Sequence, residues 1–280
     1  MNVSYPSGVL LAFRFCCLLV LILAGSSACS RSGINDGADR GDGMDLQAGQ
    51  AGQAVSPEKM AKPSIPQGEQ SLFDAIQARD ADWINQLVKE GVDLNSTNQD
   101  GLTPLMFAID RSELGVCRFL IKHGADVNLK VAGIGTPLHL AARKSTSEYV
   151  DLLIENGAKP DSLDSTGMTP AMWAANDEFY FDSLKSLVKA GCDLDVRSSP
   201  GSRGLTALMY STDSSLKVVQ FLLESGADAS IRNEDGLTAS EEIRRSMRGA
   251  GREPVTEREK LLLEKIRLLR QYEAKSDQDE

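Results

Sequence analysis

The chain has 280 residues, of which 41% are hydrophobic, 25% charged and 5% aromatic, and its formal net charge is −10. Binding to nucleic acid needs a concentrated basic patch, and an acidic chain of this kind excludes that class of partner. The composition also excludes a multi-span membrane protein, a collagen and a small disulfide-rich domain. The length allows one or two domains with a sizeable core.

Residues 1–28 are predicted to be a signal peptide. Arg14 precedes ten consecutive apolar residues, Phe15 to Ala24, and small residues follow them. A helix needs about 20 residues to cross a membrane core, so this run is too short to span one. A short apolar run between a positive charge and small residues is typical of secretory signals. The alternative is a buried N-terminal helix.

The junction that follows resembles a bacterial lipoprotein signal, because small residues lead from Gly25 to Ala28 and directly into Cys29. The resemblance implies that Cys29 is lipidated and becomes the new N-terminus, and Ser30 favours sorting to an outer membrane. Ser26 stands where such signals usually carry leucine, and Ser26 with Ala28 also suits an ordinary signal-peptidase cut. We therefore expect an exported lipoprotein facing the periplasm, with a soluble periplasmic or secreted protein as the alternative.

Residues 29–69 are predicted to be a disordered, lipid-anchored linker. From residue 30 onward this stretch holds seven glycines and three prolines but no aromatic residue. Such a segment cannot bury enough apolar surface to offset the entropy lost on ordering.

From residue 70 the chain repeats itself. One motif recurs as TPLMFA at 103–108, TPLHLA at 136–141, TPAMWA at 169–174, TALMYS at 206–211 and TASEEI at 238–243. The threonines that open these copies are 33, 33, 37 and 32 residues apart. A glycine ends an apolar stretch in each repeat, at Gly91, Gly124, Gly157, Gly191 and Gly226. Thr-Pro is suited to opening a helix and glycine to closing one, so each repeat is predicted to be a helix pair.

The period and the T-P-L-H-x-A motif resemble those of ankyrin repeats. The resemblance implies an all-α solenoid of stacked helix pairs over residues 70–274, with residues 275–280 as a disordered tail. The copy at 71–91 lacks Thr-Pro and is interpreted as an N-terminal cap. Residues 256–275 are interpreted as the last helix of a C-terminal cap, opened by a capping box at Thr256 and Glu259. The alternative is a dimerising helix with Leu262, Ile266 and Leu269 at coiled-coil spacing.

The residues that carry chemistry in other proteins do not form a recognisable site. Cys117 and Cys192 are predicted to lie about two repeats apart, roughly 20 Å, whereas a disulfide needs Cα atoms within about 7 Å. The resemblance implies a structural role for His139, and His123 ends a helix. The aspartates that recur in the turns (Asp93, Asp126, Asp193 and Asp228) are interpreted as structural. We therefore expect no catalysis, no metal and no cofactor.

One column of side chains remains as a candidate binding surface. If the threonine is position 4, positions 6, 9 and 10 form the buried stripe of the first helix, which in the first full copy consists of Leu105, Ala108 and Ile109. At 100° per residue, position 8 lies about 200° from position 6. Position 8 therefore faces outward, on what the resemblance implies is the concave side. Its occupants are Asp74, Phe107, Leu140, Trp173 and Tyr210, and position 12 adds the basic Arg111 and Lys144. Large apolar groups on an exposed column indicate a binding surface. The alternative is that they pack against the next repeat.

The sequence thus predicts a non-catalytic protein that binds a protein partner through Phe107, Arg111, Leu140, Lys144, Trp173 and Tyr210. The partner is either an envelope protein or a toxin that this protein neutralises. We expect a monomer without a nucleic-acid or small-molecule ligand, held at the membrane through its N-terminal lipid. A self-associating envelope scaffold is the alternative function. A one-residue insertion around Phe179, Tyr180 and Phe181, between the helices of the fourth copy, is a second candidate surface. The alternative is that at least one of these side chains fills the altered turn.

Overall fold

The computed structural model describes residues 69–247 and 257–279. Within these ranges the fold is all-α, as predicted: there is no β-strand, and an isolated bridge joins Val131 to Gly135. The predicted signal peptide, Cys29, the linker up to residue 68 and Thr256 of the predicted capping box lie outside the described residues, whereas Glu69, which we expected to end the linker, is the first residue of a helix. None of the described helices is long and apolar enough to cross a membrane.

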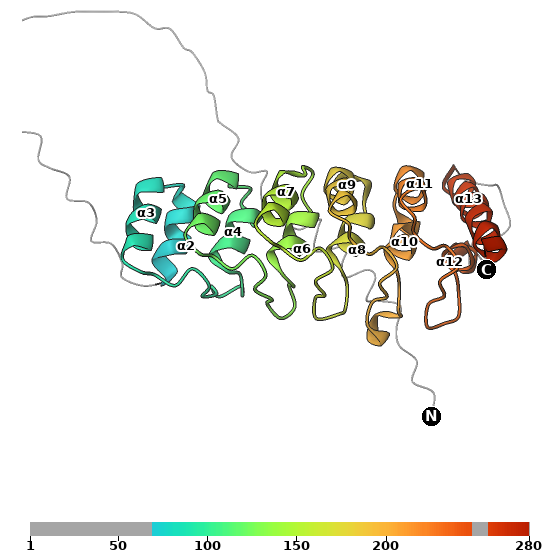
Figure 1. The fold of residues 1–280 in the computed structure, drawn as a ribbon, viewed down its shortest axis with the longest axis horizontal. Helices are drawn as coiled ribbons and strands as arrows, with labels where there is room; N and C mark the ends of the chain where they lie inside the picture. The colour runs from blue at the N-terminus through green and yellow to red at the C-terminus, as the bar shows by residue number, and fades with distance from the viewer. Residues whose placement is uncertain (1–68, 248–256, 280) are drawn as a thin grey trace, which may run out of the picture. The chain divides into compact units, whose positions relative to one another are not determined.

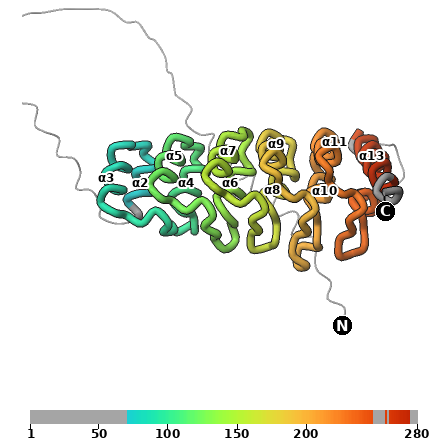
Figure 2. The backbone as a smooth tube through the Cα atoms, viewed as in Figure 1, coloured from blue at the N-terminus to red at the C-terminus, as the bar shows by residue number. Residues whose placement is uncertain are grey.

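The helices form consecutive pairs, each consisting of an inner helix and an outer helix that packs beside it, and a hairpin loop precedes the inner helix from the second pair onward (Figure 1). The pairs are α2 (Glu69–Ala78) with α3 (Ala81–Lys89), α4 (Pro104–Asp110) with α5 (Leu114–Lys122), α6 (Pro137–Ala142) with α7 (Glu148–Glu155), α8 (Pro170–Ala175) with α9 (Phe181–Lys189), α10 (Ala207–Tyr210) with α11 (Leu216–Glu224), and α12 (Ala239–Met247) with α13 (Glu257–Asp279). Each inner helix contacts the next one, from α2 through α12, so the pairs stack in chain order. The hairpin loops all lie on one side of the stack (Figure 2).

The repeated threonines start the inner helices, as predicted. Thr103, Thr169 and Thr206 each accept a hydrogen bond from the backbone N–H three residues later, which satisfies a free donor of the first turn. Pro104 and Pro170 stand in the first turn, where a missing N–H costs nothing. At the other end of each pair, the five helix-ending glycines have left-handed φ angles.

A ladder of side-chain hydrogen bonds links the hairpin loops. Asn95 Oδ1 accepts from the backbone N–H of Asp126 at 2.9 Å, and Asn128 Oδ1 accepts from that of Lys159 at 2.9 Å. Asp161 and Asp195 make the same bond to Asp193 and Asp228. Asp93, Asp126, Asp193 and Asp228 each close a local turn by accepting an N–H two residues later. These loop residues therefore have the structural role that their recurrence predicted.

Within residues 69–247, three short 3-10 helices interrupt this regular pattern. Element η1 (Glu178–Tyr180) lies between α8 and α9, where the sequence predicted an altered turn. Element η2 (Pro200–Ser202) lies in the lengthened loop before α10, and η3 (Ser211–Asp213) directly follows α10.

The core runs continuously through the stack between inner and outer helices. The predicted stripe is buried in the first full repeat: Leu105, Ala108 and Ile109 are each at most 1% exposed. At the C-terminal end, α13 packs on α11 and α12 and covers the last repeat, which confirms its predicted role as a cap. Ile266 is 6% exposed and Leu269 0%. These two side chains belong to the chain's own core, which contradicts their use as a dimerisation seam.

The C-terminal boundary also differs from the prediction. Helix α13 continues to Asp279, through residues that we expected to form a disordered tail. The sequence of this segment is polar and charged, and its backbone remains helical because no glycine or proline ends the helix before that point.

Candidate functional site

The predicted column lies along the inner helices, on α4, α6, α8 and α10. Leu140, Trp173 and Tyr210 are half-buried and pack partly on the core, which leaves part of each side chain facing solvent. Phe107 is 6% exposed, so the expectation that it faces outward is wrong. Its ring meets that of Phe73 edge-on at 5.6 Å, because the preceding repeat covers it. The exposed part of the column therefore consists of Leu140, Trp173 and Tyr210, and we call it the inner-face column.

Trp173 is the best-fixed member of this column. Its indole N–H donates to Asp164 Oδ2 at 3.0 Å, and its ring meets that of His139 at 5.5 Å. The guanidinium of Arg143 lies over the same ring, 5.5 Å from its centre. Partial burial works against ionisation of Asp164, but hydrogen bonds from Thr166, Met168 and Trp173 outweigh it and lower the pKa of the carboxyl. The indole is thus held by an ionised carboxylate.

His139 connects two repeats, and its ring meets that of Trp173 edge-on. The imidazole is fully buried, and its Nδ1 accepts from the backbone N–H of Thr136 at 3.0 Å. With Nδ1 as an acceptor, Nε2 carries the proton and donates to the carbonyl of Met168 at 3.0 Å. Burial lowers the pKa of His139 below its ordinary value of 6.5, and the bond to Met168 only partly opposes this. The structure confirms the expected structural role.

This arrangement predicts a pH dependence of stability. Because folding depresses the pKa of His139, its contribution is fully present above pH 6.5 and is lost as the pH falls through the folded-state pKa. We expect the urea midpoint of the wild type to fall as the pH is lowered from neutrality through this range. The His139→Gln variant should be less stable at neutral pH and should show a flatter profile. His123→Gln is the control, and a profile flattened equally by that change would contradict the assignment.

The two basic residues predicted for the surface differ in their surroundings. Arg111 is exposed, its guanidinium lies 5.0 Å from the centre of the Phe107 ring, and its Nη2 donates to Gln77 at 3.4 Å. Lys144 is half-buried, and its ammonium donates to the carbonyl of Asp110 at 2.9 Å and to Ser112 Oγ at 3.1 Å. Burial lowers the pKa of Lys144, against the attraction of Asp110. Lys144 therefore ties α6 to the preceding repeat.

The hollow beside Arg111 continues the inner face toward the N-terminal cap. It has a volume of about 200 Å³ and is lined by Phe73, Asp74, Gln77, Asn98, Gln99, Asp100, Phe107 and Arg111. The lining side chains are three amides, two carboxylates, two aromatic rings and one guanidinium. A surface of this kind suits the polar groups of a peptide chain.

The second predicted surface, at η1, contains one strongly exposed aromatic residue. Phe179 is 65% exposed and its ring meets that of Tyr180 edge-on. Phe181 instead packs on Phe221 at 5.2 Å, with the ammonium of Lys217 4.1 Å above its ring. Of the three aromatic residues, Phe181 thus fills the altered turn and Phe179 points outward.

Among the described residues, no group of histidine, cysteine and carboxylate side chains is arranged to hold a metal ion. Cys117 and Cys192 are both free, as expected from their separation. Burial raises the pKa of each thiol to about 12, so neither forms a reactive thiolate at neutral pH. His123 lies at the end of α5 and stacks on Phe119 at 4.1 Å.

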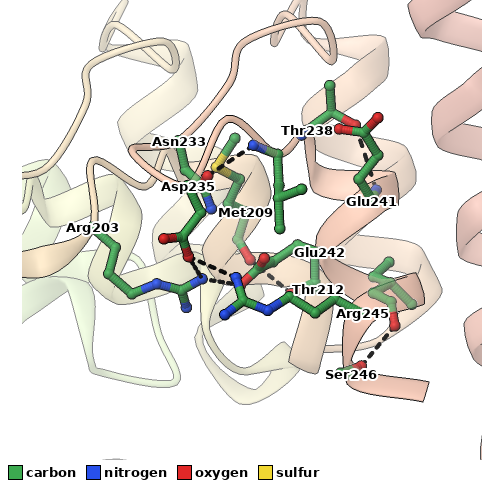
Figure 3. A network of polar contacts seen from close by, with 12 residues as sticks. Arg203, Met209, Thr212, Asn233, Asp235, Thr238, Glu241, Glu242, Arg245 and Ser246 are labelled. Atoms are coloured by element: carbon green, nitrogen blue, oxygen red, sulfur yellow. Dashed lines mark hydrogen bonds and ion pairs between the residues drawn. The ribbon is translucent and has the colours of Figure 1, made fainter. Parts of the chain in front are cut away.

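Sequence reasoning missed the ionic network at the C-terminal end of the inner face (Figure 3). Arg203, in the lengthened loop, bonds to Asp235 at 2.9 Å and to Glu242. Arg245 on α12 bonds to the same Asp235 carboxylate at 2.7 Å. Hydrogen bonds and ion pairs from both arginines hold the pKa of Asp235 below its usual range. One feature of the sequence pointed to this network: the 37-residue spacing from Thr169 to Thr206, which lengthens the loop that carries Arg203.

Comparison with known families supports the repeat pattern. A family model described as ankyrin repeats (3 copies) matches residues 72–164 and 138–235. These matches cover more than half of the chain and span the helix pairs from α2 with α3 to α10 with α11. No curated protein matches the chain.

Proposed function

Because the chain belongs to the ankyrin-repeat family, we propose that it is a non-catalytic binding protein that holds a protein partner on its inner face. The observation that carries this proposal is the inner-face column, in which Trp173 and Tyr210 are half-exposed on adjacent repeats. Tryptophan, tyrosine and arginine are the residues most often found at the energetic centre of protein interfaces. The contacts of Trp173 with Asp164 and His139 hold the indole in place before any partner arrives, which lowers the entropy lost on binding.

Substitution of the column tests this proposal. We expect Trp173→Ala with Tyr210→Ala to abolish capture of the partner after crosslinking in the native cell envelope, because it removes the exposed aromatic surface. Phe179→Ala is the matched control, since it removes an exposed aromatic side chain at the tip of η1 instead. Unfolding midpoints of all variants establish that the fold is intact. Capture that survives the double substitution but is lost in Phe179→Ala would place the interface at η1.

We further propose that the protein is exported and anchored by a lipid on Cys29, facing the periplasm, with an outer membrane favoured. The support is the sequence of residues 1–30 alone: a short apolar run, small residues and a cysteine at the junction. The partner is then another envelope protein or a toxin that reaches the envelope.

Replacing the cysteine tests the anchor. We expect Cys29→Ala to abolish labelling by a fatty-acid probe and to move the protein from the membrane fraction to the soluble fraction. Two acyl chains hold a protein stably on a bilayer, so loss of the attachment site should release nearly all of it. Cys192→Ala is the control and should leave labelling unchanged. Fatty-acid labelling that persists in Cys29→Ala would contradict the proposal.

A further inference from the structure

The hydrogen-bond ladder between the hairpin loops changes its chemistry along the stack. In four loops one side chain accepts the backbone N–H of the residue two positions after the helix-ending glycine of the next repeat, and we call it the ladder residue. The ladder residues are Asn95, Asn128, Asp161 and Asp195. The first two are neutral amides and the last two are carboxylates, which add negative charge to loops that already carry aspartates.

An amide in this place makes a second bond between loops. Asn128 Oδ1 accepts from the N–H of Lys159, and Asn128 Nδ2 donates to the carbonyl of Gly157 at 2.9 Å. Asp195 Oδ1 makes the first of these bonds, to the N–H of Asp228 at 2.9 Å. An ionised carboxylate has no proton to donate, so Asp195 can make the second bond only when it is protonated.

The carboxylate of Asp195 lies between two like charges. Asp193, in the same α10 loop (residues 191–205), accepts from the N–H of Asp195 at 2.9 Å, and Asp228 belongs to the next loop, the α12 loop (residues 226–237). Partial burial raises the pKa of Asp195, and the charges of Asp228 and Asp193 raise it further, against the bond from the Asp228 N–H, which lowers it. The folded protein therefore disfavours the ionised form of this side chain.

Asp161, the preceding ladder residue, has different neighbours. It accepts from the N–H of Asp193 at 2.8 Å, but it is exposed, whereas Asp195 is half-buried. Its own loop carries Lys159 where the α10 loop carries Asp193. A cation two residues away opposes the repulsion from the next loop. The unfavourable carboxylate is thus specific to Asp195.

The tips of the same two loops are joined by ionic bonds. Arg203 in the α10 loop bonds to Asp235 in the α12 loop and to Glu242 on α12 (Figure 3). Hydrogen bonds from Arg245 and Arg203 hold the pKa of Asp235 below its usual range. Asp235 therefore stays ionised at a pH low enough to protonate Asp195, and the tips remain joined while the base of the loops changes.

We propose that the joint between the α10 loop and the α12 loop tightens on mild acidification, through protonation of Asp195. Protonation removes one of three neighbouring negative charges and lets the carboxyl donate to the carbonyl of Gly226, as Asn128 donates to that of Gly157. The bond from Asp228 is kept, because a protonated carboxyl still has an acceptor oxygen. Acid thus fastens the C-terminal repeat and its cap more firmly to the stack, whatever partner the inner face binds.

Asparagine at position 195 reproduces the protonated side chain at every pH. Because folding raises the pKa of Asp195 above its ordinary value of 3.8, ionisation lowers stability at neutral pH, and this loss disappears as the pH falls through the folded-state pKa. We expect Asp195→Asn to lower the unfolding equilibrium constant at neutral pH roughly twofold to fivefold, the range of partly exposed charge pairs. Urea unfolding of the full chain should show this advantage shrinking as the pH is lowered toward 3.8.

Hydrogen exchange at neutral pH locates the effect. The N–H of Asp228 donates to the ladder residue, so peptides covering residues 226–237 should exchange roughly twofold to fivefold more slowly in Asp195→Asn than in the wild type. The bond between Asn95 and Asp126, at the other end of the stack, should be unaffected.

Two variants control for the amide itself. Asp161→Asn places an amide in the preceding ladder position, beside Lys159, and should give no gain in stability at neutral pH. Asp228→Asn removes one neighbouring charge and retains the oxygen that closes its own turn, so Asp195→Asn should gain less in that background. An equal gain in Asp161→Asn, a gain in Asp195→Asn that is the same at every pH, or no gain at neutral pH would overturn the inference.

Discussion

Replacement of Gly167 by alanine is expected to cost about 3 kcal/mol of stability, from a strained backbone and a forced displacement of the neighbouring loop. Gly167 has a φ angle of 74°, a backbone conformation that residues with a side chain rarely adopt. A Cβ atom there would lie 2.5 Å from the backbone nitrogen of Ser199, in the next hairpin loop. That nitrogen donates to the carbonyl of Thr166 at 3.0 Å, so the clash would also strain the bond between the two loops.

Gly157→Ala provides the matched control for this prediction. Gly157 has a φ angle of 85°, and a Cβ atom there meets nothing within 4 Å. Its replacement should cost only the left-handed backbone penalty, about 1–2 kcal/mol. Urea unfolding followed by circular dichroism measures both variants. Equal losses in the two would contradict the proposed close approach of the loops at Gly167.

The second large effect is expected from Lys265→Met. Lys265 is 1% exposed, and its ammonium donates to the carbonyl of Thr212 at 2.8 Å and to that of Ser214. Methionine fills the space of the alkyl chain but leaves both buried carbonyls without this donor. The loss is expected to be about 3 kcal/mol, as for removal of a charged donor from buried acceptors. Because the bond joins α13 to the end of the α10 repeat, faster hydrogen exchange should appear first in α13.

Lys260→Met is the control on the same helix. The Lys260 side chain is 59% exposed and pairs with Glu257 at the surface. Its replacement should change stability by no more than about 0.5 kcal/mol, because exposed pairs contribute little. Exchange in α13 that is unaffected by Lys265→Met would show that this bond does not hold the cap in place.

Most of the fold follows from local sequence signals. Thr103 and Gly124 bracket a helix pair, and each repeat of this pattern adds another pair whose apolar stripe needs a neighbour. The period therefore predicts the stack, the missing Thr-Pro at 71–91 and the capping box at Thr256 predict its caps, and helical periodicity predicts the burial of Leu105. The role of His139 also follows, because it occupies the histidine position of the T-P-L-H-x-A motif, whose structural use the family resemblance implies.

The candidate site was less predictable because exposure depends on neighbours in the next repeat. Helical periodicity predicts that the side chain of Phe107 points away from the core of its own repeat. It does not show that the ring of Phe73, in the preceding repeat, covers that side chain. The same limit applies to Lys144, whose ammonium turns back to the preceding repeat, and to Arg203, whose partners lie on the following one. Contacts between repeats decide which side chains remain available to a partner, and no single repeat encodes them.

Site-specific photocrosslinking in intact cells shows directly whether the partner lies against the inner face. A benzoylphenylalanine crosslinker is placed in the full chain at position 140 or 210 of the inner-face column, or at position 179 as the control. We expect positions 140 and 210 to crosslink to the same polypeptide, and position 179 not to crosslink to it. Crosslinks to a partner from position 179 alone would contradict the assignment of the inner face as the binding surface.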